Sequence, residues 1–407
     1  MATNAYCTTT VDVWVNEVLQ NNPELQSYRV QIEIAKASRL QAGVWENPQI
    51  NSSYGGKKAW SGEADEIEEK GNAVDISLTQ TIEWPGRLEL KKAIADKDIE
   101  LAELDLEQFQ SFLSIRAKMA LYDLFASRQI EAASVEVSDH FSALKKVLDQ
   151  RSPAGLTPLL EARVIDTLDL NMKRKATEAS LRAQTALRDW NVLRGASMDK
   201  EFVSIPIALS FRPLQQREDE LLALAFVHNY ELRRSQFVLK RQDLNVRLAQ
   251  NEQLPAVSVG PYFSQEEAGD KERVVGGMIS LPLPLWNRNQ GNIAAQQSRQ
   301  SQSQIAADLA RREAERCLRE EISTYRQKQQ EISAWTPESI RHFKEAAELA
   351  DRHYRLGAVP VTVYVELQTQ YLEAIQGLLE TQREALEAAL TLEMLTGGSL
   401  NLVEGRE

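Results

Sequence analysis

The stretch from residue 87 to residue 152 contains neither glycine nor proline. It is rich in Ala, Leu, Glu, Gln, Arg and Lys, the residues that lose least conformational freedom on entering a helix. A single helix over this stretch would be about 100 Å long, at about 1.5 Å per residue. No compact domain contains such a helix, so we expect an elongated chain that is mainly α with a small β part.

The sequence contains an internal duplication, since matching residues recur in the same order about 200 positions apart. The recurring residues pair Asn22 with Asn229, Trp84 with Trp286, Tyr122 with Tyr325, Gly155 with Gly357, and Gly195 with Gly397. We therefore predict a first repeat over residues 11–197 and a second over 218–399. A proline-containing linker over 198–217 joins the repeats, and a C-terminal tail covers 400–407.

Each repeat is predicted to contain a helix, a pair of strands, a long helix, a glycine-containing turn and a returning helix. In the first repeat these are a helix over 11–45 that bends or restarts at Pro23, strands over 49–60 and 73–84, and helices over 87–152 and 158–194. In the second they are strands near 257–263 and 275–285, a long arm over 292–356 interrupted at Pro337, and a return over 361–396. Pro282 and Pro284 weaken the last strand, because proline donates no ladder hydrogen bond.

The second strand of the first repeat alternates between apolar and polar residues, which is the period of a strand with two different faces. Its apolar side consists of Val74, Ile76, Leu78, Ile82 and Trp84. No run of about 18 apolar residues exists, so no transmembrane helix is expected. Strands that cross a membrane in a barrel need only about 10 alternating residues each.

Other classes of function find no support in the sequence. A net charge of −12 without a basic block argues against a nucleic-acid partner. The cysteines Cys7 and Cys317 and the four histidines are dispersed, so we expect no metal site and no disulfide. No phosphate loop, nucleophile elbow or dinucleotide fingerprint occurs, so we expect neither an enzyme nor a cofactor. Residues 1–4 are not those of a signal peptide, which we expect to be absent from this chain.

Several motifs, in this order and duplicated, resemble those of the TolC-type outer membrane factor family. They are Asn21-Asn22-Pro23-Glu24-Leu25, Asn47-Pro48, the stretch Gln80-Thr81-Ile82-Glu83-Trp84-Pro85-Gly86-Arg87, the segment Arg355-Leu356-Gly357-Ala358-Val359-Pro360, and Leu395-Thr396-Gly397-Gly398. The resemblance covers nearly the whole chain, and residues 82–87 are closest to the heavy-metal, cation-efflux branch.

The resemblance implies a fold, a location and partners. Family members are homotrimers in which each protomer contributes four strands to a shared 12-stranded β-barrel in the outer membrane lipid of Gram-negative bacteria. Their helices form a tunnel in the periplasm. Such a protein is the passive exit duct of a tripartite efflux system, and it receives substrates, here metal cations, from an inner membrane pump of the RND type and a periplasmic adaptor. The side of Val74, Ile76, Leu78, Ile82 and Trp84 then faces lipid.

The resemblance also assigns roles to residues at the helical turns. The adaptor-docking tip would consist of Gly155, Leu156, Thr157, Gly357, Ala358 and Val359. The tunnel gate would consist of the carboxylates of Glu161 and Glu366, with Arg352 or Arg355 as the counter-charge. Val363 stands where the second repeat of relatives carries a further acid.

Each of these residues also has a purely structural interpretation. The glycines are also ordinary helix ends, and a solvated helix face accounts for any single glutamate. Cys7 is either a lipid anchor or an unmodified thiol. At the level of the whole chain, a type I protein secretion duct has the same architecture with a different cargo, whereas a soluble coiled-coil scaffold leaves the paired strands unexplained.

Overall fold

The computed structural model describes residues 10–60, 67–151, 159–202, 208–335, 337–398 and 400–406. The chain divides into two compact units, and both draw on both repeats. Unit one comprises Met1–Ser27, Leu106–Leu232 and Arg311–Glu407; unit two comprises Tyr28–Asp105 and Arg233–Ala310. Among the described helices, none is long and apolar enough to cross a membrane.

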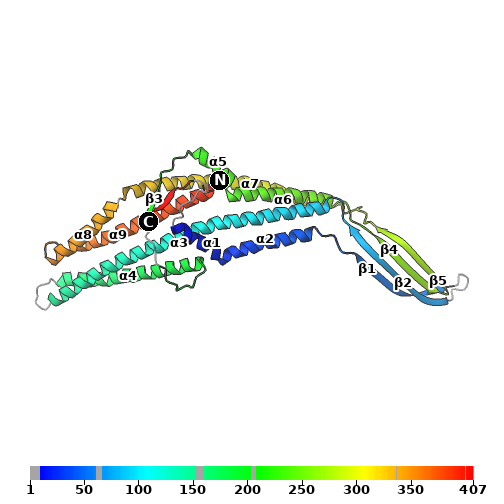
Figure 1. Ribbon diagram of the computed structural model, residues 1–407, viewed down its shortest axis with the longest axis horizontal. Helices are drawn as coiled ribbons and strands as arrows, with labels where there is room; N and C mark the ends of the chain where they lie inside the picture. The colour runs from blue at the N-terminus through cyan, green and yellow to red at the C-terminus, as the bar shows by residue number, and fades with distance from the viewer. Residues whose placement is uncertain are drawn as a thin grey trace, which may run out of the picture. The chain divides into compact units, whose positions relative to one another are not determined.

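The two repeats have the predicted order of elements (Figure 1). The first contains α1 (Thr10–Asn21), α2 (Pro23–Ala42), β1 (Gln49–Trp60), β2 (Ile67–Ile82), α3 (Arg87–Arg151) and α4 (Leu159–Leu193). The second contains α5 (Glu218–His228), α6 (Tyr230–Asn251), β4 (Val257–Ala268), β5 (Asp270–Ser280), α7 (Gln290–Ala334), α8 (Pro337–Arg355) and α9 (Val361–Leu395). The predicted fold class, mainly α with a small β part in a duplicated unit, is confirmed, and α3 alone has 65 residues.

The predicted bounds of two strands, β2 and β5, were wrong. The first helix restarts at Pro23, because Asn22 interrupts it and caps the second one. β2 begins at Ile67 and ends at Ile82, so it takes in part of the predicted loop and leaves out Trp84. β5 ends at Ser280, before Pro282, because proline cannot donate to the ladder. The predicted linker and tail contain β3 (Ala208–Phe211) and β6 (Val403–Arg406), which pair with each other.

In unit two, polar contacts hold four helices side by side in the order α2, α3, α6, α7. Arg39 binds Asp96 between α2 and α3, and the Arg241 guanidinium lies 2.7 Å from Asp98 between α3 and α6. Gln242 donates to Gln296 at 2.8 Å between α6 and α7. α2 and α7 are therefore the edges of this helical layer.

The motif that precedes α3 fastens the strands to this layer. Gly86 adopts a φ of +82°, which a residue with a side chain rarely adopts, and this turn brings Arg87 to the end of α6. There Arg87 donates to the side chain of Asn251 at 3.1 Å and to the carbonyl of Leu254. Asn251 in turn donates to the carbonyl of Pro85 at 3.0 Å. The role of the Pro85-Gly86-Arg87 motif is thus structural, because it links the end of β2 to the end of α6.

Unit one has its largest core where helices of both repeats meet. Phe141 on α3, Ile165 on α4 and Tyr364 on α9 are almost completely buried in one cluster. The β3–β6 pair packs beside a second cluster, where the Tyr325 hydroxyl donates to the carbonyls of Arg212 and Leu402 at 2.6 and 3.3 Å. The linker and the tail are therefore part of the packed structure of this unit.

Candidate functional site

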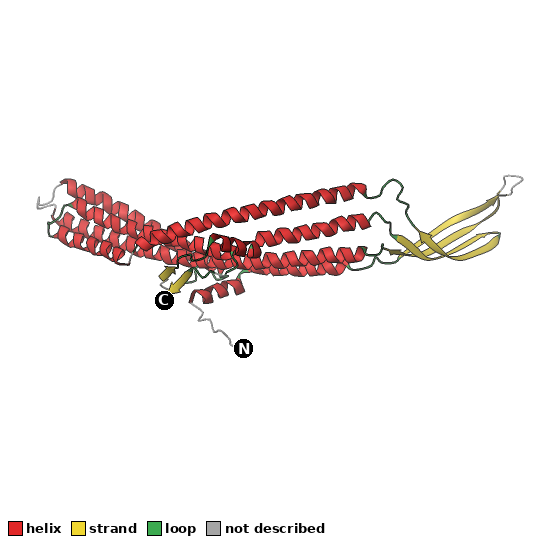
Figure 2. Cartoon of the chain, turned by 90° about the horizontal axis from the view of Figure 1, so that it is seen from above, coloured by secondary structure: helices red, strands yellow, loops and turns green. Residues whose placement is uncertain are grey.

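The strands form one antiparallel sheet in the order β1-β2-β4-β5, seen side by side in Figure 2. The central pair joins β2 of the first repeat to β4 of the second, with Ile76 opposite Phe263. β1 and β5 are its edges, and neither has a further strand beside it in the described part of the chain. Two hairpins from separate repeats thus make a single open sheet.

The strand pairing places most of the large apolar residues of the four strands on one face, because directly opposite residues share a face. Ile50 lies opposite Leu78, and Phe263 lies between Ile76 and Val275. The members of this apolar face are Ile50, Tyr54, Val74, Ile76, Leu78, Ile82, Val257, Val259, Phe263, Val275 and Ile279. Several are strongly exposed, since Ile50, Val275 and Ile279 expose 75%, 79% and 77% of their surface.

The other face of the sheet is polar and rich in small residues. At its centre, Asp75 lies between Ser53 and Ser264, and the Ser53 hydroxyl donates to its carboxylate at 3.0 Å. Nearer the hairpin turns, Lys57 lies 2.5 Å from Glu266. The two faces of the sheet therefore differ in the way expected for a wall between apolar and aqueous surroundings.

The residues predicted to face lipid are mostly placed together. Val74, Ile76, Leu78 and Ile82 share the apolar face of β2. Trp84 follows the end of the strand and exposes 38% of its surface. The sequence reasoning did not find Ile50 and Tyr54 as members of this face, although their alternation in β1 is a visible signal.

In the turn between α8 and α9, a glycine ends the preceding helix. Gly357 adopts a φ of +72°, and its N–H donates to the carbonyl of Tyr354. The N–H of Ala358 donates to the carbonyl of His353. Leu356 exposes 80% of its surface, whereas Val359 packs against the core. The predicted tip residues Gly155, Leu156 and Thr157 lie outside the described residues.

The structure does not bring the described members of the predicted gate into contact. Glu366 is exposed on α9 and accepts a hydrogen bond from Gln370. Arg355 binds Asp351 on its own helix at 2.9 Å, and Arg352 is exposed. Neither arginine contacts Glu366 in the chain, and the side chain of Glu161 lies outside the described residues. A counter-charge for Glu366 is therefore not provided by these two arginines within one chain.

Beneath the turn lies a buried aromatic group that the sequence reasoning missed. The ring of Tyr364 is stacked on that of Tyr354, with centroids 5.3 Å apart, and lies 5.2 Å from that of Phe141. Its hydroxyl has no hydrogen-bond partner among the described residues, and burial raises the pKa of Tyr364. Tyr364 falls at a core position of a helical period, which was the available signal.

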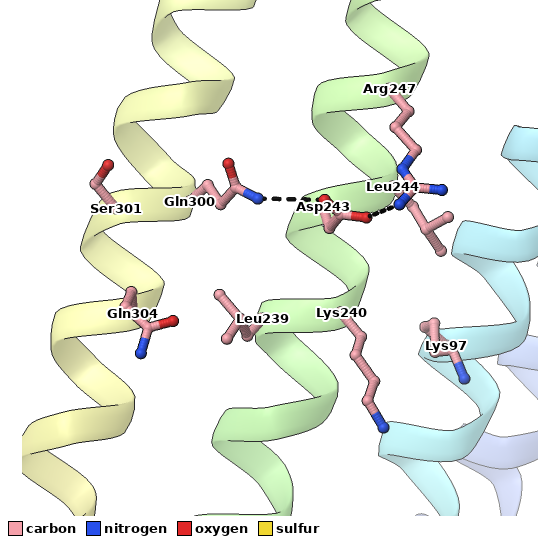
Figure 3. Close-up of a pocket in the computed structure, with 9 residues that line it drawn as sticks. All are labelled: Lys97, Leu239, Lys240, Asp243, Leu244, Arg247, Gln300, Ser301 and Gln304. Carbon is pink, nitrogen blue, oxygen red and sulfur yellow. Dashed lines mark hydrogen bonds and ion pairs between the residues drawn. The ribbon is translucent and has the colours of Figure 1, made fainter.

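A polar groove of about 700 Å³ crosses α3, α6 and α7 in unit two (Figure 3). Asp243 lies between Gln300, which donates to it at 3.3 Å, and Arg247, which lies 2.8 Å away. Lys97 on α3 and Lys240 on α6 also line the groove. The charges are solvated and partly paired, so the groove gives no enclosed site for a ligand.

Solved structures share the fold of the whole chain. The CmeC outer membrane channel of Campylobacter jejuni matches with a TM-score of 0.76 and 16% identity, over 96% of this chain and 86% of that chain. CusC, in structures concerned with transmembrane channel formation, matches with a TM-score of 0.73 and 14% identity, over 97% and 93%. The open state of the Neisseria gonorrhoeae MtrE outer membrane channel gives 0.68 and 15%, over 95% and 89%. The fold is therefore that of the TolC-like outer membrane channels.

The family assignment rests on the second repeat. Residues 221–398 match the family described as outer membrane efflux protein. No curated protein matches the sequence. The family match and the shared fold over nearly the whole chain together confirm the resemblance to the TolC-type outer membrane factor family.

Proposed function

We propose that this chain is one protomer of a trimeric outer membrane channel, the passive exit duct of an efflux system. The observation that carries the proposal is the sheet, whose exposed apolar face belongs to four strands with two unpaired edges. Open edges cannot persist in lipid, because no water satisfies their backbone groups. Pairing β5 of one copy with β1 of the next closes the wall, and three copies give 12 strands.

The dimensions of the apolar face support this role. From Ile82 to Val74 the apolar side of β2 extends about 27 Å along the strand, at about 3.4 Å per residue. The apolar band of a membrane barrel is about 25 Å tall and is flanked by aromatic residues. Tyr54 and Trp84 stand at the two ends of the band here. The polar face, with Asp75 at its centre, then lines the aqueous lumen.

The helical part is proposed to form the periplasmic tunnel. The exposed turn at Gly357 and Ala358, together with Gly155, Leu156 and Thr157 in the other repeat, would dock a periplasmic adaptor. An inner membrane pump of the RND type would supply the energy. Val359 is packed rather than exposed, so it would support the docking turn from beneath. In this scheme the Gram-negative outer membrane holds the sheet, and the chain performs no catalysis.

The gate is proposed to lie at the tunnel entrance. Three copies of Glu366, with three of Glu161, would form a ring of carboxylates that concentrates cations. Because Arg355 already binds Asp351, any counter-contact that holds the gate shut would come from Arg352 or from a neighbouring protomer. Residues 82–87 favour metal cations as the cargo. No group of three or more potential ligands for a metal occurs among the described residues, so metal would pass without tight binding.

Two measurements test the proposed function. Purified protein should have the mass of a trimer and should conduct ions in a planar bilayer, whereas a monomeric, water-soluble product would favour the coiled-coil scaffold. Deleting the gene and measuring tolerance to metals, drugs and dyes would identify the cargo. A loss of secreted protein with unchanged tolerance would favour a type I secretion duct.

A further inference from the structure

The charges near the hairpin turns of the sheet are divided unequally between its two faces. On the polar face, the like charges Glu266 and Glu272 lie directly opposite each other, and Lys57 lies 2.5 Å from Glu266. On the apolar face, Lys58 lies directly opposite Lys70. Like charges in this position destabilise a sheet. On the polar face, Lys57 offsets the repulsion between the two glutamates. The repulsion between Lys58 and Lys70 on the apolar face must be offset in another way.

Among the residues whose side chains the structure describes, none provides a counter-charge for the lysine pair. Lys58 and Lys70 are both exposed, and neither forms an ion pair within the described part of the chain. Glu267, the acid of β4 on that face, lies 3.2 Å from Lys271 and is already paired with it. Glu69 is separated from Lys70 by one step along the strand and therefore points to the other face.

Two further cations extend this group along the same face. Arg273 belongs to the row of Val74 and Gln265, and Lys271 belongs to the next row toward the turns. Lys58 and Lys70 form the row beyond that. We call Lys58, Lys70, Lys271 and Arg273 the cationic rim. The rim therefore begins where the apolar band ends, at Val74 and Tyr54.

We infer that the cationic rim binds the phosphorylated headgroups of membrane lipids around the outer end of the barrel. This inference rests on the proposed function, which sets the apolar face in lipid. A lipid whose chains cover Ile76 and Val275 carries its headgroup to the level of the rim. A phosphate between Lys58 and Lys70 then replaces the repulsion of two cations by two attractive contacts. The lumen-facing Lys57 takes no part.

The test uses full-length protein purified in detergent, with lipid retention counted by native mass spectrometry. The probes are diphosphoryl lipid A, its dephosphorylated form, phosphatidylcholine and inorganic phosphate. The wild-type protein should retain diphosphoryl lipid A in preference to the dephosphorylated form, which has no phosphate, and to phosphatidylcholine, whose phosphate is neutralised by its own choline cation. One cation near an anionic lipid surface contributes a factor of about five, so Lys58→Gln with Lys70→Gln should weaken binding about 25-fold. Arg273→Gln alone should weaken it about five-fold.

Lys57→Gln is the matched control, because Lys57 adjoins Lys58 in the chain but lies on the polar face. The inference is wrong if this control weakens lipid binding as much as the double substitution does. Equal retention of lipid A and phosphatidylcholine by the wild type also overturns it, as does displacement of lipid A by millimolar inorganic phosphate. Trimer mass and conductance are measured on the same preparations. If the wild-type protein is not trimeric or does not conduct ions, the proposed function is wrong. If the variants conduct normally and bind lipid as the wild type does, only the inference about the cationic rim is wrong.

Discussion

The side-chain amide of Asn22 donates to the backbone carbonyl of Leu193 at 3.0 Å, so the start of α2 is joined to the end of α4. The same side chain caps α2, because its oxygen accepts hydrogen bonds from the N–H groups of Glu24 and Leu25. Gly195 lies so close to this junction that an added Cβ would meet the Asn21 carbonyl oxygen at 2.9 Å. Two motifs of the first repeat, far apart in sequence, thus form one joint.

Asn22→Ala should destabilise the protein. The substitution removes a helix cap and leaves a carbonyl at the end of α4 without its partner, which together cost about 2 kcal/mol. The thermal midpoint in detergent should fall clearly below that of the wild type. Asn21→Ala is the control, because the exposed Asn21 side chain forms none of these bonds. Equal midpoints for the two variants would show that the joint contributes nothing.

Leu78→Arg should reduce the yield of trimers, and Thr79→Arg should not. Leu78 is on the apolar face, where a charge at the bilayer midplane costs about 2 to 4 kcal/mol. Thr79, its neighbour in β2, points to the polar face. The measurement is the amount of trimer extracted from membranes at equal expression. Equal yields would contradict the assignment of the two faces.

Glu321→Gln should stabilise the protein near neutral pH. Burial, together with Glu387 and Glu320, raises the pKa of Glu321 above its ordinary value of 4.5. Because the folded-state pKa is raised, ionisation of Glu321 destabilises the fold. The protein is therefore more stable when Glu321 is protonated, and it loses that stability as pH rises through the folded-state pKa. The neutral glutamine avoids the loss, and its advantage should vanish below about pH 4, where glutamate is also neutral. Glu320→Gln, which breaks an ion pair with Arg316, should bring no gain. A benefit that persists in acid would contradict the electrostatic cause.

Glu161→Gln with Glu366→Gln should reduce the preference of the channel for cations. A ring of carboxylates at a constriction attracts cations and repels anions. The reversal potential in planar bilayers under a salt gradient measures the preference. The difference from the wild type should fade near 1 M salt, where the screening length is about 3 Å. An unchanged reversal potential at low salt would remove these residues from the gate.

Local patterns in the sequence were sufficient for the order of the elements. The absence of glycine and proline between residues 87 and 151 predicts α3, and the alternation around Leu78 predicts the two faces of β2. The end of β5 was missed although Pro282 marks it, because the apolar alternation continues past that residue. Such patterns report on neighbours a few positions apart along the chain.

Contacts between distant residues could not be predicted in this way. The partners Asp123 and Arg383 are 260 positions apart, and the opposition of Lys58 and Lys70 depends on the exact pairing of β1 with β2. Shifting a strand by one residue would move every side chain to the other face. The buried Tyr364 beneath the turn depends on the packing of α3 and α8 around it. These features follow only from three-dimensional structure.

The most direct test of the proposed function is to find on which side of the outer membrane the turn between β4 and β5 and the helical turn at Gly357 each lie. Single cysteines are placed by Asp270→Cys, at the turn between β4 and β5, and by Ala358→Cys, at the helical turn, with Cys7 and Cys317 replaced by serine. A membrane-impermeant maleimide is then applied to intact cells. The account predicts labelling at position 270 on intact cells and labelling at position 358 only after the outer membrane is permeabilised. Labelling at position 358 on intact cells, with position 270 protected, would contradict it.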